Sequence, residues 1–259
     1  MVLLFTLQSS PCYVYSLPVG ALGSQVVGLS RFHYPETPRR EQLGAIPPQL
    51  FLSERIIMAP KPPPGVLSSF IASPALFPFN VQVKDHLSSH PSTHRIVAAA
   101  LVFSPSNPAH VLIVQRSATD YVPNLWEIPG GSCDPDESIL AGTVRELWEE
   151  SGLIATEVLR QVGESYEWVE EGTVWCKFSF EVEVKGMEVT LDKEEHQAFH
   201  WVTEDECRKG EVVRDGKRTE IKWTNESQVA VILEGFRLRE EDKRAAAKLT
   251  SRACPSRAA

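Results

Sequence analysis

Hydrophobic residues recur along this chain with two different periods from residue 95 onward, and each period predicts one type of element. Six stretches rich in β-branched and aromatic residues predict strands: residues 96–103, 111–114, 126–129, 165–169, 173–184 and 196–202. A polar turn over residues 104–110 predicts that the first two strands form a hairpin or an adjacent pair. Glu171 and Gly172 predict a second turn, between the fourth and fifth strands.

A helix is predicted between the third and fourth of these strands. Apolar side chains repeat there at helical spacing, at Ile139, Leu140, Val144 and Leu147. We expect the helix to begin with Asp134 as N-cap, Pro135 at the first helical position and Glu137 at the third. Gly152 stands where a left-handed residue is wanted, so we expect the helix to end there.

A second helix is predicted over residues 227–239, where apolar residues again share one face. Strands on both sides of one helix, followed by a last helix, predict an α/β fold with a mixed sheet between helices. For each of the two segments that flank this predicted domain, two structures are possible from the sequence. Residues 80–90 are expected as a short helix or a strand on the domain edge, and the tail from Glu241 as a frayed helix or disorder.

Proline and charge separate a leader from the folded domain near residue 91. We expect residues 1–57 to be a leader, 58–94 a proline-rich linker and domain edge, 95–240 the folded domain, and 241–259 a charged, alanine-rich tail. No basic residue precedes the apolar start, which disfavours a secretory signal. The leader is then either a mitochondrial targeting peptide or an extension upstream of a true start at Met58. We expect a cytoplasmic protein, with a mitochondrial location as the alternative.

Composition favours a soluble enzyme and argues against several other classes of protein. The chain has 259 residues, of which 42% are hydrophobic and 23% charged, enough for one sizeable core plus extensions. A net charge of −8 without a basic patch argues against a nucleic-acid scaffold or a membrane-surface protein. The five cysteines are scattered without a C-x-x-C pair, which predicts a reducing compartment and no structural zinc.

Three carboxylates gather on one side of the first predicted helix. Glu146, Glu149 and Glu150 occupy positions i, i+3 and i+4, within a single helical turn. Their mutual repulsion costs stability unless a cation binds between them, and oxygen ligands of this kind suit Mg²⁺ or Mn²⁺. Arg145 lies four residues before Glu149 and is expected to hold that carboxylate in place. A solvated acidic helix face is the alternative interpretation of these three glutamates taken alone.

Residues 131–153, which contain these glutamates, read GSCDPDESILAGTVRELWEESGL. The segment resembles the Nudix box, G-x5-E-x7-R-E-U-x-E-E-x-G-U with U aliphatic, and it matches that pattern at every specified position. The chain therefore resembles the Nudix hydrolases over residues 95–240. This resemblance implies an α/β/α sandwich and the hydrolysis of a pyrophosphate bond in a nucleoside diphosphate linked to another moiety.

The family's chemistry also implies a set of catalytic and metal-binding residues. The resemblance places Mg²⁺ or Mn²⁺ on the backbone carbonyl of Gly130 and on the carboxylates of Glu146, Glu149 and Glu150. A further glutamate takes the proton of the attacking water. In some members this is a glutamate of the box, here Glu146, and in others it lies on a later loop, for which Glu195 and Glu194 are the candidates. An ordinary solvent-exposed loop is the alternative interpretation of these last two.

A finer resemblance points to MutT-like enzymes that destroy oxidised nucleoside triphosphates. The residues that carry it stand at matching spacing before the box and at the start of the last helix: Arg116, Asn124, Glu127, Pro129, Asn225 and Glu226. By analogy, Arg116, Trp126, Glu127 and Asn225 would contact the substrate, and Tyr121 offers another ring for stacking. Purely structural roles are the alternative, because Arg116 ends a strand, Asn225 is a good N-cap and tryptophan is commonly a core residue.

The chain also differs from the sequence patterns of other Nudix subfamilies, and these differences leave the identity of the substrate open. Val169 occupies a position at which ADP-ribose hydrolases often have proline, and residues 209–223 are an insertion relative to the compact MutT pattern. We expect a pyrophosphohydrolase that acts on a nucleoside triphosphate, with oxidised forms as candidates. ADP-ribose or another nucleotide sugar is the alternative substrate, and a non-catalytic nucleotide-binding module is the alternative class. The expected partner is a small-molecule nucleotide, without nucleic acid or membrane, and the oligomeric state is left open.

Overall fold

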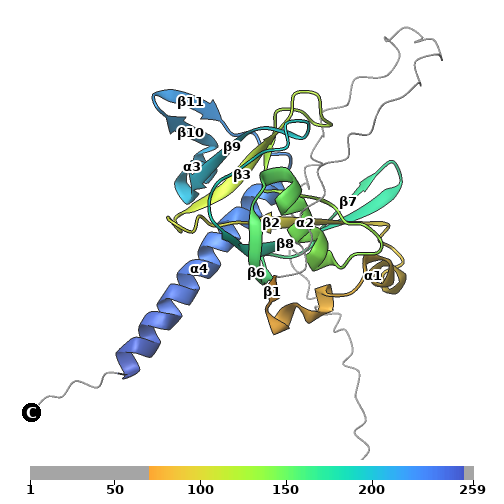
Figure 1. Ribbon diagram of the computed structural model, residues 1–259, viewed down its shortest axis with the longest axis horizontal. Coiled ribbons are helices and arrows are strands. Elements are labelled where there is room, and N and C mark those ends of the chain that lie inside the picture. The colour runs from red at the N-terminus through yellow and green to blue at the C-terminus, as the bar shows by residue number, and fades with distance from the viewer. Residues whose placement is uncertain (1–69, 254–259) are drawn as a thin grey trace, which may run out of the picture. The chain divides into compact units, whose positions relative to one another are not determined.

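The computed structural model describes residues 70–253, so the expectations for residues 1–57 and for the first part of the linker lie outside the described part of the chain. The described strands form a larger and a smaller sheet and a separate hairpin (Figure 1). The larger sheet comprises β1 (Ile71–Ala72), β2 (Arg95–Leu101), β5 (Gly130–Ser132), β6 (Ile154–Gln161), β7 (Tyr166–Glu170) and β8 (Thr173–Lys185). The smaller sheet comprises β3 (His110–Arg116), β4 (Trp126–Glu127) and β9 (His196–Thr203), and the hairpin comprises β10 (Glu211–Arg214) and β11 (Lys217–Glu220).

Five helices are interspersed with these strands along the described part of the chain. They are a short 3-10 helix η2 (Pro74–Phe79), α1 (Val83–Ser89), α2 (Ile139–Ser151), α3 (Glu204–Lys209) and α4 (Glu226–Ala253). The larger sheet has the order β1-β6-β8-β2-β5 and is mixed: β2 runs parallel to β8 and β1 parallel to β6, whereas β5 is antiparallel to β2 and β6 is antiparallel to β8. Each of the six predicted strands overlaps an observed one, and the predicted mixed α/β architecture is confirmed.

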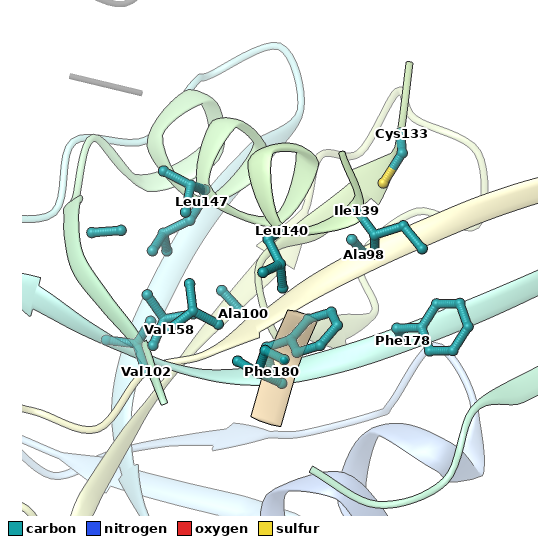
Figure 2. Close-up of a cluster of buried hydrophobic side chains, with 14 of the residues drawn as sticks. Ala98, Ala100, Val102, Cys133, Ile139, Leu140, Leu147, Val158, Phe178 and Phe180 are labelled. Atoms are coloured by element: carbon teal, nitrogen blue, oxygen red, sulfur yellow. The ribbon is translucent and has the colours of Figure 1, made fainter. Parts of the chain in front are cut away.

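Strand β2 is an interior strand of the larger sheet, between β8 and β5, and contributes side chains to both faces of the sheet. Ala98 and Ala100 join the hydrophobic core on the α2 face, and Ala99 and Leu101 join a second core that contains Ile232 and Phe236 of α4. A strand buried on both faces has a nearly continuous apolar sequence, which explains the uninterrupted run in β2. In the first core, Leu140 and Leu147 of α2 point toward Phe180 and its neighbours on the sheet (Figure 2).

Helix α2 begins later than the sequence predicted. Its N-cap is Ser138, whose hydroxyl accepts a hydrogen bond from the backbone N–H of Ala141, so the expected start at Asp134 is wrong. The backbone carbonyls of Pro135 and Glu137 instead accept hydrogen bonds from the N–H groups of Lys84 and Val83 in α1. The turn before α2 therefore docks on another helix, a contact that local capping rules do not include. The end is as predicted, with Gly152 in the left-handed region at φ 68°.

The predicted pairing of the first two strands is confirmed only where they adjoin the turn over residues 104–110. Strand β2 has β8 on one edge and β5 on the other, so no edge remains for β3. Strand β3 pairs with β4 and β9 in the smaller sheet. It meets the chain that follows β2 in a short antiparallel contact, with a bridge between Phe103 and Val111 and backbone hydrogen bonds of 2.9 Å on either side of it. The hairpin of β7 and β8 around Glu171 and Gly172, by contrast, is confirmed.

Several elements had no prediction. Strand β6 carries Glu157 and Arg160 among its apolar residues, so its alternation was weak. Helix α3 begins with a complete capping box between Thr203 and Glu206, a signal that the sequence did offer. The insertion over residues 209–223 is largely the hairpin of β10 and β11.

The two segments with open alternatives are both helical. Residues 83–89 form α1, and α4 continues to Ala253, far beyond the predicted end at residue 239 (Figure 1). Val83 and Leu76 are only 2% and 3% exposed and belong to the first core, so the packed structure includes residues upstream of 95. Within residues 70–253, none of the helices has an apolar stretch long enough to span a bilayer.

Candidate active site

Four acidic side chains from two elements meet beside the glycine pair of β5. Helix α2 contributes Glu146, Glu149 and Glu150, of which Glu146 and Glu150 are buried and Glu149 is half-buried. Glu195 immediately precedes β9 and lies within electrostatic range of all three. The structure therefore brings the glutamates of the predicted helix together with the predicted loop glutamate.

Backbone glycines bring β5 close to these carboxylates. The N–H of Gly130 donates a hydrogen bond of 2.7 Å to Oε2 of Glu150, which ties the carboxylate to the strand. At Gly131, a Cβ atom would lie 2.5 Å from Oε2 of Glu146, so any side chain there would displace that carboxylate. Gly130 itself has φ 155°, and a Cβ on it would lie 2.5 Å from the carbonyl oxygen of Ala98. Both glycines are thus required by the close approach of strand and helix.

Arg145 is the cation that organises this side of α2. It lies 2.7 Å from Glu137, 2.9 Å from Glu146 and 2.7 Å from Glu149, and it also donates to the carbonyl of Ser132. The expected support of Glu149 by Arg145 is thus present in the structure. Burial lowers the pKa of Arg145, but the carboxylates around it raise that pKa above its usual value, so the guanidinium stays charged.

One arginine does not neutralise the cluster. Burial raises the pKa of Glu146 to about 7, against the lowering effect of Arg145 and with a further contribution from Glu149 and Glu195. Burial also raises the pKa of Glu150 well above its usual value, and nearby Glu127 and Glu146 add to that rise. Glu195 is exposed as a residue, yet partial desolvation of its carboxylate and the charge of Asp192 raise its pKa as well. Carboxylates that resist ionisation together indicate a site completed by a cation.

A second group of charged side chains adjoins the glutamates on the strand side. The Arg116 guanidinium lies 2.6 Å from Glu127 and 2.6 Å from Asp120. Burial raises the pKa of Glu127, but the neighbouring His196, Lys177 and Arg116 lower it below its usual value, so Glu127 is charged. Lys177 is only 8% exposed, and burial lowers the pKa of its amino group against the raising effect of nearby Glu127 and Glu150.

The donor set fits a hard divalent ion. Carboxylate oxygens dominate it, Glu150 is fixed by a backbone N–H, and the crowded negative charge opposes ionisation of the cluster without a cation. Mg²⁺ and Mn²⁺ prefer oxygen ligands of this kind and keep several waters that phosphate oxygens can replace. The arrangement can therefore place a diphosphate against a cation in a partly desolvated site, where electrostatic interactions are strengthened.

The predicted substrate-contacting residues have well-defined structural partners. Trp126 is 1% exposed and stacks on His200 with ring centroids 5.1 Å apart, so it lies in the second core. Asn225 accepts a hydrogen bond of 3.0 Å from the backbone N–H of Ser227 at the start of α4. Tyr121 is exposed, and its hydroxyl donates to Glu170 at the tip of the β7–β8 hairpin. The substrate-contacting roles of these residues remain predictions.

Two residues of the site were missed from the sequence. Lys177 stands among apolar and aromatic residues in the first half of β8, where a lysine is a signal because lysine is almost never buried without a partner. His196 directly follows the candidate base Glu195 and is 1% exposed. A histidine at the start of a strand gives no comparable signal, because its burial depends on the sheet that packs around it.

Comparisons with known proteins agree with this geometry. Residues 93–223 match the NUDIX domain family. The chain is 33% identical over 105 residues to the bovine m7GpppN-mRNA hydrolase NUDT17, a match that covers 38% of this chain and 35% of that protein. It is 34% identical over 114 residues to the CTP pyrophosphohydrolase of Escherichia coli, covering 43% of this chain and 77% of that one.

A solved structure is similar as well. The solution structure of the E. coli ORF135 protein is 25% identical in sequence, has a TM-score of 0.44, and covers 57% of this chain and 91% of its own. The match to NUDT17 spans only about a third of the length of that relative.

Proposed function

Because this chain belongs to the Nudix family, we propose that it is a metal-dependent pyrophosphohydrolase that cleaves a nucleoside diphosphate linked to another moiety. The proposal rests above all on one observation. Glu146, Glu149, Glu150 and Glu195 converge beside the glycine pair, and burial and mutual repulsion raise the pKa values of Glu146, Glu150 and Glu195. A solvated acidic helix face, the alternative interpretation, would leave these side chains exposed, whereas Glu146 and Glu150 are buried.

The residues of the site divide the work of hydrolysis among them. Glu146, Glu149 and Glu150, with the carbonyl of Gly130, would hold Mg²⁺ or Mn²⁺, which when bound neutralises phosphate oxygens and makes bound water more acidic. Arg145 fixes the positions of Glu146 and Glu149 through its ion pairs. In its charged form Lys177 would limit the negative charge near Glu150 and so reduce the repulsion that an arriving phosphate meets.

Two carboxylates can accept the proton of the attacking water. Burial raises the pKa of Glu146 to about 7 in the metal-free protein, and a cation bound nearby would lower that pKa, so Glu146 would be ionised and able to accept a proton at neutral pH. Glu195 is exposed, so water reaches it directly. Exchange of the base to glutamine abolishes the acidic limb of the pH–rate profile, whereas exchange of the other glutamate lowers the rate without removing that limb.

We propose a nucleoside triphosphate as the substrate, with CTP and oxidised purine forms as the first candidates. Similarity to the E. coli CTP pyrophosphohydrolase, which this chain matches over 77% of its length, supports this class. Arg116 stands beside the carboxylate cluster and would contact the phosphates or the base, with Glu127 as its buried partner. The amide of Asn225 caps α4 through its oxygen, which leaves its nitrogen to read the edge of a base.

A second candidate substrate carries two bases. Tyr166, Trp168 and Trp175 stack in series, with centroid distances of 5.8 and 5.7 Å. Cross-strand pairing places Tyr166 opposite Lys177 and Trp168 opposite Trp175, so these rings share the sheet face of Lys177. Such a stack can be extended by a planar base while the phosphates lie at the carboxylates. A capped or dinucleoside polyphosphate fits this layout, and the relative NUDT17 is named an m7GpppN-mRNA hydrolase.

The test is a substrate panel with Mg²⁺ or Mn²⁺, read as release of phosphate or pyrophosphate. The panel contains CTP, the other nucleoside triphosphates, 8-oxo-dGTP, m7GpppG, dinucleoside polyphosphates, ADP-ribose and NADH. Preferred turnover of single-base triphosphates supports the first candidate, and preferred turnover of m7GpppG or dinucleoside polyphosphates supports the second. Preference for ADP-ribose supports the nucleotide-sugar alternative. Tight binding without turnover of any of them identifies a non-catalytic module and contradicts the proposal.

The decisive variant is Glu150→Gln. Glutamine has nearly the same shape and its side-chain oxygen can still accept from the N–H of Gly130, so the fold is retained. We expect turnover to fall about 100-fold or more, the scale of losing a metal or acid–base role. Circular dichroism checks the fold, and an exposed exchange on the same domain, Glu188→Gln, is the matched control. Activity of Glu150→Gln close to that of the control would refute the assignment of the site.

A further inference from the structure

His196 is a buried histidine without a hydrogen-bond partner at the edge of the carboxylate cluster. It is the first residue of β9, and only 1% of its surface is exposed. Neither ring nitrogen has a hydrogen-bond partner among residues 70–253. Its Nε2 lies 3.8 Å from Oε1 of Glu127, beyond hydrogen-bond distance. Buried polar atoms are nearly always satisfied, so two unpaired nitrogens on one ring indicate that the ring has another partner.

The ring is placed where a metal ion would be that partner. A ring nitrogen of His196 and carboxylate oxygens of Glu150 and Glu195 all lie within 4.8 Å of one another. The three residues come from two elements, α2 and the start of β9, which the backbone holds in place. Glu150 is fixed by Gly130, and the N–H of Ser117 donates to the backbone carbonyl of Glu195. Two of the three ligands thus have supported positions before any ion binds.

We infer that His196 is a nitrogen ligand of a divalent ion held together with Glu150 and Glu195. The inference rests on the proposed function for its purpose, since this ion would lie within the site where the diphosphate is cleaved. An imidazole nitrogen next to two carboxylates forms a mixed nitrogen and oxygen site. Such a site favours first-row transition ions such as Mn²⁺ over Mg²⁺, which prefers oxygen ligands alone.

Glu127, the acidic group 3.8 Å from the His196 ring, has closer partners of its own. Glu127 already pairs with Arg116 at 2.6 Å and lies near Lys177, so it has no need of a third cation. A histidine needed only to fill space between the sheets would have been satisfied by one of these groups or replaced by an apolar residue. A ring nitrogen within 4.8 Å of carboxylate oxygens of both Glu150 and Glu195 suits metal ligation better than packing alone.

The test is Mn²⁺ binding to the full-length protein without substrate, followed by EPR. Pulsed EPR detects nitrogen nuclei bound to Mn²⁺, and the free Mn²⁺ signal gives the Kd. We expect nitrogen coupling in the wild-type protein that changes when histidine is isotopically labelled. His196→Gln should remove the coupling and weaken Mn²⁺ binding about tenfold or more, while Mg²⁺ binding changes little. The matched control is His200→Gln on the same strand, whose ring stacks on Trp126 and which should retain both the coupling and the Kd.

Two results would overturn the inference. One is bound Mn²⁺ without nitrogen coupling in the wild-type protein, a measurement that decides the matter even if His196→Gln fails to fold. The other is nitrogen coupling that persists in a folded His196→Gln variant. The proposed function can fail separately from this inference. Nitrogen coupling without turnover of any substrate would contradict the hydrolase and support the role of His196 as a metal ligand. Turnover without nitrogen coupling would support the hydrolase and contradict that role of His196.

Discussion

At the scale of single residues, Glu146 makes the stability of the metal-free protein depend on pH. Burial raises the pKa of this carboxyl from 4.5 to about 7. A carboxyl whose pKa is raised by folding stabilises the fold while protonated, so this contribution is complete below about pH 4.5 and is lost as the pH rises through about 7. With about 1.4 kcal/mol for each pKa unit, the loss is about 3 kcal/mol.

We therefore expect the free energy of unfolding, measured with urea in EDTA, to fall between about pH 5 and about pH 7.5. Glu146→Gln should make that decline smaller by about 3 kcal/mol, because glutamine cannot titrate, and the raised pKa values of Glu150 and Glu195 should account for the part that remains. The surface exchange Glu188→Gln should keep the wild-type decline. Saturating Mn²⁺ should restore stability at the higher pH, since a ligand that binds only the folded state stabilises it. A decline of the same size in Glu146→Gln would show that other groups cause it.

The metal-binding part of the site could be predicted from sequence because it is local. Glu146, Glu149 and Glu150 share one helical turn, and helical geometry alone places them together. Lys177 and His196 reach the same place from β8 and β9, and their approach depends on sheet pairing that no local pattern encodes. The sequence showed which residues could bind a metal ion, but it could not show which residues complete the site from distant strands.

At the scale of elements, most strands and both long helices could be predicted from periodicity, whereas boundaries and partners could not. The start of α2 depends on hydrogen bonds from α1, and the partners of β2 depend on which edges other strands occupy. Strand β6 was missed because Glu157 and Arg160 interrupt its apolar pattern. In each case a contact distant in sequence decided the outcome, which is the limit of reasoning from local pattern.

Helix α4 stabilises the domain through its middle rather than its end. Arg239 pairs with the fully buried Glu181 at 2.6 Å and lies 3.9 Å from the centre of the Phe103 ring. Asp242 pairs with Arg160, the second partner of Glu181. Residues 243–250 are all exposed. A chain that ends at residue 237 should lose about 3–5 kcal/mol of stability, because a buried carboxylate is left with one partner whose own support is gone.

A chain that ends at residue 244 is the matched control for this truncation. It keeps every contact of Arg239 and Asp242 and should lose less than about 1 kcal/mol, the scale of a change confined to the surface. Urea unfolding of both truncated chains measures the difference. Equal losses for the two would place the stabilising contacts of α4 elsewhere.

At the scale of the whole molecule, the family match and the packed structure begin at different residues. The NUDIX match starts at residue 93, close to the expected domain start at residue 95, yet Leu76 and Val83 are buried in the first core. Strand β1 also adds to the edge of the larger sheet by pairing with β6. The segment from residue 70 to residue 90 therefore contributes to the stability of the domain although it lies outside the family pattern.

Two shortened chains test this contribution. A chain that begins at residue 70 keeps β1, η2 and α1 and should retain the stability of the domain. A chain that begins at residue 91 exposes the surface that Leu76 and Val83 cover, and burial of each such side chain contributes about 1.5–3 kcal/mol. It also removes the α1 groups that bind Pro135 and Glu137 next to the carboxylate cluster, so turnover should fall together with stability. Equal urea midpoints and equal turnover for the two chains would show that residues 70–90 contribute neither to the stability of the domain nor to its activity.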